Sequence, residues 1–287
     1  MGTKTTFIGF GEAGQRFARR GDHAFDIKTL ADTTAASKRD DYVASGVHGC
    51  EIVETALMNA ATIFSLVTAD SALAVAMDCG AFLQPGALWL DMNSVAPGTK
   101  RAASFAIEAC GGRYVDVAIM APVHPQGLAV PLLVSGPHRA EAIEALHAHG
   151  FTHVADGGER IGEASAIKMI RSVLVKGLEA LTTEVALAAH AAGVEDRVFA
   201  SLDASWRPQS WSERSDYNLE RMMVHGLRRA AEMEEVARTL AELGVDGALT
   251  RATIERQRAI GALGIVPHPG LATKVAALAP SRKDVAA

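Results

Sequence analysis

A glycine-rich turn close to the N-terminus constrains the fold of this chain more than any other feature. Residues 9–14 read Gly9-Phe10-Gly11-Glu12-Ala13-Gly14, the pattern G-x-G-x-x-G, between a strand-like run over 6–9 and a helix-like run over 13–20. In such a turn the first glycine permits the tight bend, the second lets the backbone approach a pyrophosphate, and the third lets the helix pack on the strand. The turn therefore predicts a dinucleotide site formed by Gly9, Phe10, Gly11, Glu12, Ala13 and Gly14.

An acidic side chain further along the chain indicates which dinucleotide binds. Asp32 follows Gly14 by 18 positions and is expected at the end of the second strand, predicted over 25–30. A carboxylate at that place accepts hydrogen bonds from the ribose hydroxyls and repels a 2′-phosphate. Lys38 and Arg39 lie nearby and could bind that phosphate instead. The sequence therefore favours NAD, with NADP as the less favoured alternative.

Short apolar runs alternate with helix-like segments through the first half of the chain. Strands are expected over 6–9, 25–30, 63–67, 88–91, 114–119 and 131–134, and helices over 13–20, 71–82, 97–110 and 140–149. This alternation implies right-handed crossovers and a mostly parallel sheet covered on both faces. We therefore predict the α/β class, with a Rossmann-type doubly wound sheet in a dinucleotide-binding domain over 1–158.

The second half of the chain has a different rhythm. From 161 to 192 the sequence has no proline, and apolar residues recur at spacings of 3 or 4, at Ile167, Ile170, Leu174, Leu178, Leu181 and Val185. This stripe predicts one helix of about thirty residues, roughly 45 Å long. Further helices over 194–205, 217–243 and 246–263 predict an all-helical substrate and dimerisation domain over 159–287, joined by the long interdomain helix. The tail beyond 267 is expected to be loosely ordered.

Composition excludes several classes of function. The net charge is −5, from 28 basic and 33 acidic residues, so the chain lacks the basic surplus with which proteins neutralise nucleic-acid phosphates. No apolar run reaches the roughly 18 to 20 residues that span a bilayer. The three cysteines have no metal-like spacing, so no metal site is expected. Free thiols and the absence of a signal peptide favour a reducing cytoplasm.

The glycine-rich turn and a second segment resemble the β-hydroxyacid dehydrogenase family, which includes 6-phosphogluconate and 3-hydroxyisobutyrate dehydrogenases. The family segment Asp-x-Ser-Thr-x-x-Pro resembles Asp91-Met92-Asn93-Ser94-Val95-Ala96-Pro97 here, with Asn93 in place of the first serine. In the family this loop lies beside the nicotinamide, which implies cofactor contacts from Asn93 and Ser94. Both residue types also cap helices, so a helix-capping role is the alternative. Thr68 and Ala69, after the strand at 63–67, are expected to line the same cleft.

A third segment carries the catalytic residue that the resemblance implies. The family pattern G-x-G-x-x-x-K-x-x-x-N resembles residues 162–172, where Gly162 and Lys168 are retained and Ser172 replaces the asparagine. As hydride leaves a carbon for the nicotinamide, its hydroxyl must lose a proton. A lysine whose pKa is lowered by desolvation can take that proton, with effects of roughly 10² to 10⁴ in rate. The resemblance implies this role for Lys168, with Ser172 on the same helix face. A solvated lysine on a polar face is the alternative.

The segments expected to bind substrate depart from the family. The substrate loop Asp-x-x-x-Ser-Gly-Gly resembles residues 116–122, where Met120, Ala121 and Pro122 replace the Ser-Gly-Gly backbone that grips a carboxylate in relatives. This change suits an apolar or aromatic substrate end. His124 could add a polar contact. In the helical domain, Trp206, His225 and Arg228 are candidate pocket residues, with ordinary core and interface packing as the alternative.

Together these features predict an NAD-dependent dehydrogenase that acts on a β-hydroxy acid or a related hydroxylated compound, including aromatic ones. Family members usually form homodimers, which implies a homodimer here. The alternative is a redox-neutral lyase that holds NAD tightly, in which transient oxidation of a hydroxyl makes a neighbouring C–C bond labile. A dehydrogenase accumulates NADH, whereas such a lyase leaves no lasting NADH absorbance.

Overall fold

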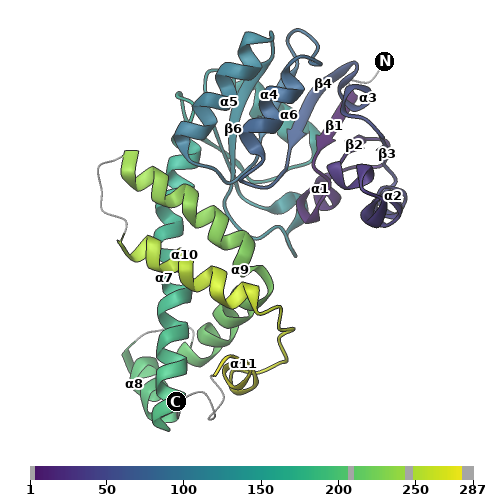
Figure 1. The fold of residues 1–287 in the computed structure, drawn as a ribbon. Helices are drawn as coiled ribbons and strands as arrows, with labels where there is room; N and C mark the ends of the chain where they lie inside the picture. The colour runs from purple at the N-terminus through teal and green to yellow at the C-terminus, as the bar shows by residue number, and fades with distance from the viewer. Residues whose placement is uncertain (1–3, 206–209, 243–247, 280–287) are drawn as a thin grey trace. The chain divides into compact units, whose positions relative to one another are not determined.

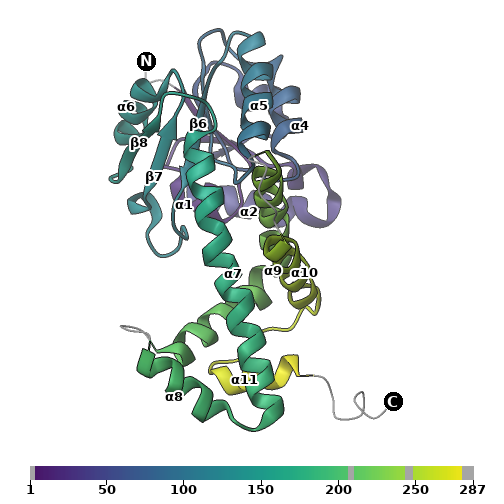
Figure 2. The ribbon, with the colours of Figure 1, turned by 90° about the vertical axis from the view of Figure 1, so that its left-hand side faces the viewer.

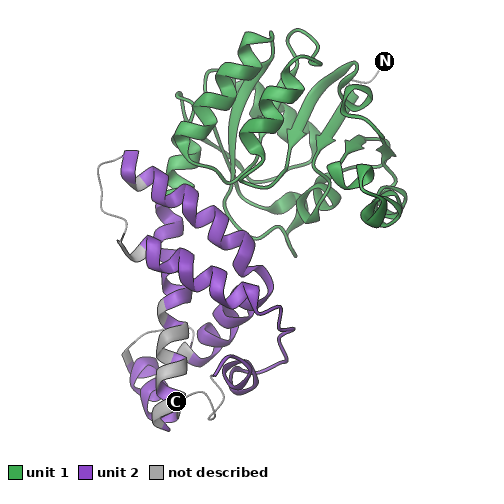
Figure 3. Ribbon diagram, viewed as in Figure 1, with its two compact units in different colours: residues 1–169 green, residues 170–287 purple. Residues whose placement is uncertain are grey.

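The computed structural model describes residues 4–205, 210–242 and 248–279 (Figure 1). The chain divides into two compact units, residues 1–169 and 170–287, which are coloured separately in Figure 3.

Unit 1 is built on one eight-stranded sheet with the strand order β3-β2-β1-β4-β5-β6-β7-β8. Neighbouring strands are parallel except β6 and β7, which run antiparallel. The strands are β1 (Lys4–Ile8), β2 (His23–Phe25), β3 (His48–Gly49), β4 (Ala60–Ser65), β5 (Leu88–Asp91), β6 (Arg113–Ile119), β7 (Leu132–Ser135) and β8 (Val154–Gly158). The predicted α/β class with a doubly wound, mostly parallel sheet is confirmed.

Both faces of the sheet are apolar because successive residues of a strand point to opposite sides. Phe7 and Phe64 stack on one face with ring centroids 4.7 Å apart, while their neighbours Ile8 and Ile63 belong to the core on the other face. The helices of unit 1 are α1 (Glu12–Phe17), α2 (Asp32–Ser45), α3 (Val53–Leu57), α4 (Ala72–Gly80), α5 (Pro97–Ala109) and α6 (Arg139–His149). Side chains of α1, α2 and α6 complete the first core, and those of α3, α4 and α5 the second. Figure 2 shows α6 on one side of the sheet and α4 and α5 on the other.

The second strand is shorter than predicted. Strand β2 ends at Phe25, and a 3₁₀ helix, η1 (Ile27–Leu30), replaces the rest of the predicted strand. The side chain of Asp26 accepts a hydrogen bond from the backbone nitrogen of Lys28 (3.0 Å), which turns the chain at this point. The placement of Asp32 at the end of a strand is therefore wrong, because Asp32 is the first residue of α2.

Among its described residues, all regular structure of unit 2 is helical. Helix α7 (Glu163–Ala192) begins in unit 1 and continues into unit 2, which also contains α8 (Glu195–Ser205), α9 (Trp211–Glu242), α10 (Ala248–Ala262) and α11 (Leu271–Leu278). Helices α9 and α10 cross closely at two glycines, since a Cβ atom on Gly226 would lie 2.8 Å from the Cα atom of Gly261.

The tail is more ordered than predicted, because α11 occupies part of it. Lys274 of α11 is buried and makes ion pairs with Asp216 (2.8 Å) and Glu220 (2.7 Å) of α9. The expectation of a loosely ordered tail is therefore wrong for residues 271–278. Within the described residues, no helix combines the length and the apolar character that a membrane crossing requires.

Candidate active site

The glycine-rich turn after β1 has the geometry that a dinucleotide requires. Gly9 has a positive φ of 88°, and a Cβ atom there would lie 2.3 Å from the carbonyl oxygen of Leu66, so only glycine fits. A Cβ atom on Gly14 would lie 2.8 Å from the carbonyl oxygen of Gly9, which explains the close packing of α1 on the turn. Gly11 has no atom within 4 Å of its Cβ position, so this side of the turn is open to a ligand. The residues present therefore fit a bound pyrophosphate.

Asp26 is the carboxylate that directly follows β2, the place where dinucleotide-binding folds carry the ribose-binding acid. Its Oδ2 accepts a hydrogen bond from the backbone nitrogen of Phe10 (2.7 Å), so the carboxylate lies against the glycine-rich turn. The sequence reasoning missed this residue because it expected a longer first helix, whereas α1 has 6 residues and brings β2 forward. The sequence feature that could have pointed to Asp26 is its position immediately after the apolar pair Ala24-Phe25.

The two cations that could have favoured NADP are engaged elsewhere. Lys38 is buried, and its Nζ donates to the carbonyl of Phe10 (2.7 Å) and pairs with Asp41 (2.5 Å), so it supports the turn. Arg39 is exposed and forms a bidentate pair with Glu51, whose hydrogen bond raises the pKa of Arg39. Each of the two cations therefore has a carboxylate partner on the protein.

The loops after β1, β4 and β5 meet at one edge of the sheet, because these three strands are parallel neighbours. Thr68 and Ala69 follow β4, and Asn93 and Ser94 follow β5. The two loops are tied directly, since the Oδ1 atom of Asn93 accepts a hydrogen bond from the backbone nitrogen of Val67 (2.7 Å). The structure thus brings the predicted cofactor residues of the glycine-rich turn and of these two loops to one edge of the sheet.

Asn93 has a structural role in its loop. It is buried, and its Nδ2 donates to Oδ1 of Asp91 (2.8 Å) and to the hydroxyl of Ser65 (3.0 Å). Its backbone nitrogen also donates to Oδ1 of Asp91 (2.9 Å). These contacts use both the oxygen and the nitrogen of the Asn93 side-chain amide, so Asn93 shapes the loop. The hydroxyl of Ser94 is the neighbouring polar group of this loop that interacts with Lys168.

Lys168 lies beside this loop. The lysine is half-buried in the second turn of α7, and its Nζ donates a hydrogen bond to Oγ of Ser94. The start of α7 touches the same loop at Gly162, which has a φ of 98° and whose Cβ position lies 2.9 Å from Cβ of Pro97. A larger residue at Gly162 would push the helix away from the loop. The retained glycine of the family pattern therefore has a local packing reason.

The predicted substrate loop follows β6, whose carboxyl end lies at the same sheet edge as that of its parallel neighbour β5. Met120 and Ala121 are half-buried, whereas Pro122 and His124 are exposed. The backbone nitrogen of Met120 donates to the carbonyl of Pro131 (2.8 Å), which fixes the start of the loop. The loop therefore has apolar side chains at Met120 and Ala121, next to the sheet, and an exposed imidazole at His124.

The remaining predicted residues belong to unit 2. Ser172 is buried one turn after Lys168 along α7, and His225 is half-buried in α9. Arg228 makes an ion pair with Glu232 one turn further along α9. Trp206 lies outside the described residues. The part of these residues in a substrate site stays a prediction.

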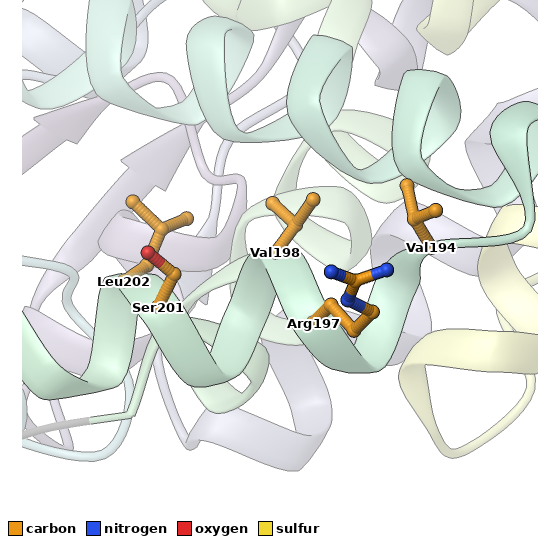
Figure 4. A pocket seen from close by; sticks show the side chains of 5 residues that line it. All are labelled: Val194, Arg197, Val198, Ser201 and Leu202. Carbon is orange, nitrogen blue, oxygen red and sulfur yellow. The ribbon is translucent and has the colours of Figure 1, made fainter.

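An open hollow on α8 adds no chemistry to this site. Figure 4 shows the side chains that line it, Val194, Arg197, Val198, Ser201 and Leu202, which all come from one helical segment. Its aliphatic members recur at the spacing of one helical turn, as in ordinary packing. None of the predicted site residues lines this hollow, and no group of three or more metal-ligating side chains occurs among the described residues.

A dinucleotide turn on a doubly wound sheet, with a lysine reaching the loop after β5, defines a class of protein: the β-hydroxyacid dehydrogenase-like, NAD-binding oxidoreductases. A profile of the NAD binding domain of 6-phosphogluconate dehydrogenase matches residues 4–155, and a profile of a domain of unknown function (DUF1932) matches residues 189–260. The chain belongs to the family that carries this NAD-binding domain.

Solved structures agree with this assignment. A conserved hypothetical protein from Sinorhizobium meliloti is 35% identical, with 97% of this chain and 96% of that chain covered and a TM-score of 0.71. A conserved protein of unknown function, described as structurally similar to 3-hydroxyacid dehydrogenases, is 30% identical over 91% of this chain and 99% of that chain, with a TM-score of 0.66. The fold is also that of a Mycobacterium tuberculosis 3-hydroxyisobutyrate dehydrogenase, with a TM-score of 0.73 at 16% identity over 97% and 99% of the two chains.

Proposed function

We propose that this chain is an NAD-dependent dehydrogenase that oxidises a β-hydroxy acid or a related hydroxylated compound, with Lys168 as general acid/base. The observation that carries the proposal is the hydrogen bond from Nζ of Lys168 to Oγ of Ser94, at the sheet edge that also carries the glycine-rich turn. When bound, NAD supplies a hydride acceptor. The amine of Lys168 takes the proton of the substrate hydroxyl as its C–H bond is broken, and Ser94 holds the amine in place.

The proposed cofactor is NAD. Its pyrophosphate would lie on the open side of Gly11, and the carboxylate of Asp26 would accept hydrogen bonds from the ribose hydroxyls. The same carboxylate would repel a 2′-phosphate. The engagement of Lys38 by Phe10 and Asp41 supports this preference, because it removes a cation that NADP would need.

The proposed substrate has an apolar or aromatic end. Met120, Ala121 and Pro122 would contact it in place of the backbone that grips a carboxylate in relatives. A hydrocarbon or ring gains from burial against such side chains, whereas a second carboxylate would be left without donors there. We further propose that Ser172, His225 and Arg228 supply the polar contacts to the rest of the substrate.

We propose that the chain acts as a homodimer. Ile167, Ile170 and Leu174 are 46%, 49% and 72% exposed and recur at spacings of 3 and 4 along α7. A continuous apolar stripe on one helix face favours burial against a second copy of the chain. Light scattering after gel filtration at micromolar concentration should give twice the chain mass, and a monomer would contradict this part of the proposal.

The reducing cytoplasm is the proposed location. Cys50, Cys79 and Cys110 are all free thiols, and burial raises the pKa of Cys79 to about 12, so that thiol stays protonated and unreactive. Fractionation of the native host, with a specific antibody against this chain, tests the location.

The test of function is a substrate screen with purified chain and NAD. A panel of β-hydroxy acids with aliphatic and aromatic substituents is incubated with NAD, and NADH absorbance and carbonyl products are followed together. Product and NADH in equal amounts support a dehydrogenase. Carbonyl products without lasting NADH absorbance would support the redox-neutral lyase instead.

A further inference from the structure

Three charged side chains form a buried cluster beneath the Asp91–Pro97 loop. Asp91 of β5 and Asp116 of β6 are register partners on neighbouring parallel strands, and Lys100 of α5 lies between them. Its Nζ is 2.9 Å from Oδ1 of Asp91 and 3.3 Å from Oδ1 of Asp116, and the three side chains are at most 1% exposed. Burying two adjacent carboxylates is costly unless a cation lies between them. Lys100 is the cation of this cluster.

One carboxyl group of this cluster holds the loop. Oδ1 of Asp91 accepts hydrogen bonds from both the backbone and the amide of Asn93, the residue before Ser94. Oδ2 of Asp91 accepts the hydroxyl of Tyr114 (2.6 Å). Burial and the nearby carboxylates of Asp91 and Asp116 raise the pKa of Tyr114 well above its ordinary value, so this phenol remains a donor. Asp91 thus fixes the backbone that presents the Ser94 hydroxyl.

The other carboxyl group holds the beginning of α7. Oδ2 of Asp116 accepts hydrogen bonds from the backbone nitrogens of Gly162 (3.2 Å) and Ser165 (3.0 Å) and from the hydroxyl of Ser135 (3.0 Å). Its Oδ1 accepts the hydroxyl of Ser165 (2.6 Å). Gly162 directly precedes α7 and Ser165 lies in its first turn, one turn before Lys168, so Asp116 sets where the helix starts, while Ser135 ties the same carboxylate to β7.

From this arrangement we infer that Lys100 is a positioning residue: by bridging Asp91 and Asp116 it fixes the separation between the Ser94 hydroxyl and the Lys168 amine. The bridge closes a ring of contacts that runs from Asp91 through the loop to Ser94, across to Lys168, and back along α7 to Asp116. This inference rests on the proposed role of Lys168.

The test compares two conservative variants with a matched control. Tyr114→Phe removes a donor to Asp91, and Ser165→Ala removes the hydroxyl donor to Asp116. The control, Thr6→Val, removes a buried hydrogen bond of similar length, to the carbonyl of Ala56 (2.8 Å), from β1 of the same sheet. For each variant we would measure the Tm, NADH binding, and the pH dependence of Lys168 modification by an amine-reactive reagent, using peptide mass spectrometry and exposed Lys28 as the internal reference.

Tyr114→Phe and Ser165→Ala should each accelerate modification of Lys168 by about three- to tenfold, the range expected for coupling within one hydrogen-bond network. The reason is that a displaced Ser94 hydroxyl no longer holds the amine of Lys168 in one place, so the amine reaches the reagent more readily. Thr6→Val should lower the Tm comparably and leave Lys168 modification unchanged. If Lys168 reacts in both variants as it does in Thr6→Val, the inference is overturned.

Lys100→Met is the most severe variant, and where it folds it should accelerate Lys168 modification more than either conservative change. If it does not fold, Tyr114→Phe and Ser165→Ala decide the question. Because modification requires no turnover, this outcome is separate from the proposed function, which fails on its own if Lys168→Ala keeps full activity.

Discussion

The amine of Lys168 donates a hydrogen bond to the hydroxyl of Ser94, which lies 74 residues earlier in the chain. The contact joins the second turn of α7 to the loop after β5, next to the loops after β1 and β4. A proton-transferring group is effective only when it is held within hydrogen-bond reach of the reacting atom. Loss of this contact is therefore expected to slow proton transfer by Lys168.

Ser94→Ala should lower kcat by about 10- to 100-fold with a smaller change in KM, because the lysine amine loses the contact that orients it. Fluorescence titration with NADH shows separately whether the Ser94 hydroxyl also contacts the cofactor. Ser104→Ala is a matched control, since it removes a hydroxyl of α5 that bonds the carbonyl of Arg101 (2.9 Å). Equal kinetic losses in both variants would argue against an orienting role for Ser94.

Asp26→Asn should weaken NADH binding by about tenfold or more, because hydrogen bonds to a charged group are lost. The ratio of NADH affinity to NADPH affinity should also fall. The amide oxygen can still accept the hydrogen bond from the Phe10 backbone nitrogen, whereas the bond from the Lys28 backbone nitrogen to Oδ1 is lost, so the Tm of the variant is measured alongside its affinities. Asp32→Asn, at the exposed start of α2, is the control and should leave both affinities unchanged. The opposite result would return the ribose-binding role to Asp32.

Substitutions at two glycines of the turn should separate folding from binding. Gly9→Ala should lower the free energy of unfolding by about 1 to 3 kcal/mol, because its φ is positive and its Cβ would strike the carbonyl of Leu66. Gly11→Ala meets no atom within 4 Å, at a φ of −83°, and should fold normally while NADH binding falls. Chemical denaturation and NADH titration of both variants provide the check. Normal NADH affinity in Gly11→Ala would argue against a pyrophosphate on this turn.

The stability of unit 1 should fall as the pH is lowered through the histidine range. Burial lowers the pKa of His149, although its hydrogen bond to the carbonyl of Phe17 (2.9 Å) and the nearby Asp22 act in the opposite direction. The histidine of the unfolded chain therefore binds a proton more readily than His149 of the folded chain. The contribution of His149 to the free energy of unfolding is complete above the unfolded pKa of about 6.5. It is lost as the pH falls towards the pKa of His149 in the folded chain.

His149→Gln keeps a donor for the Phe17 carbonyl and should flatten this part of the Tm-against-pH curve. His153→Gln, an exposed histidine nearby in sequence, is the control. Identical curves for wild type and His149→Gln would show that His149 does not contribute.

Local patterns predicted the sheet, because buried parallel strands are short apolar runs and the glycine-rich turn has few structural solutions. The short strands β3 (His48–Gly49) and β8 (Val154–Gly158) were missed, since neither is an apolar run and their pairing depends on neighbours distant in sequence. Asp26 was missed because the length of α1 could not be judged from the glycine motif alone.

The buried cluster also lay beyond sequence reasoning. Asp91 and Asp116 stand out in the sequence only as members of family segments, and no sequence pattern singles out Lys100. Their connection is set by strand register between β5 and β6 and by the approach of α5, which are properties of the tertiary fold. The contact between Lys168 and Ser94 required both segments of the family pattern to be placed in space.

The most direct measurement of the central claim is the turnover of Lys168→Ala with a substrate found in the screen, alongside its NADH affinity. The proposal predicts a fall in kcat of about 10² to 10⁴, unchanged NADH affinity, and partial recovery of activity when a small primary amine is added to the assay. Turnover equal to that of the wild type, with or without added amine, would contradict the role of Lys168 as general acid/base.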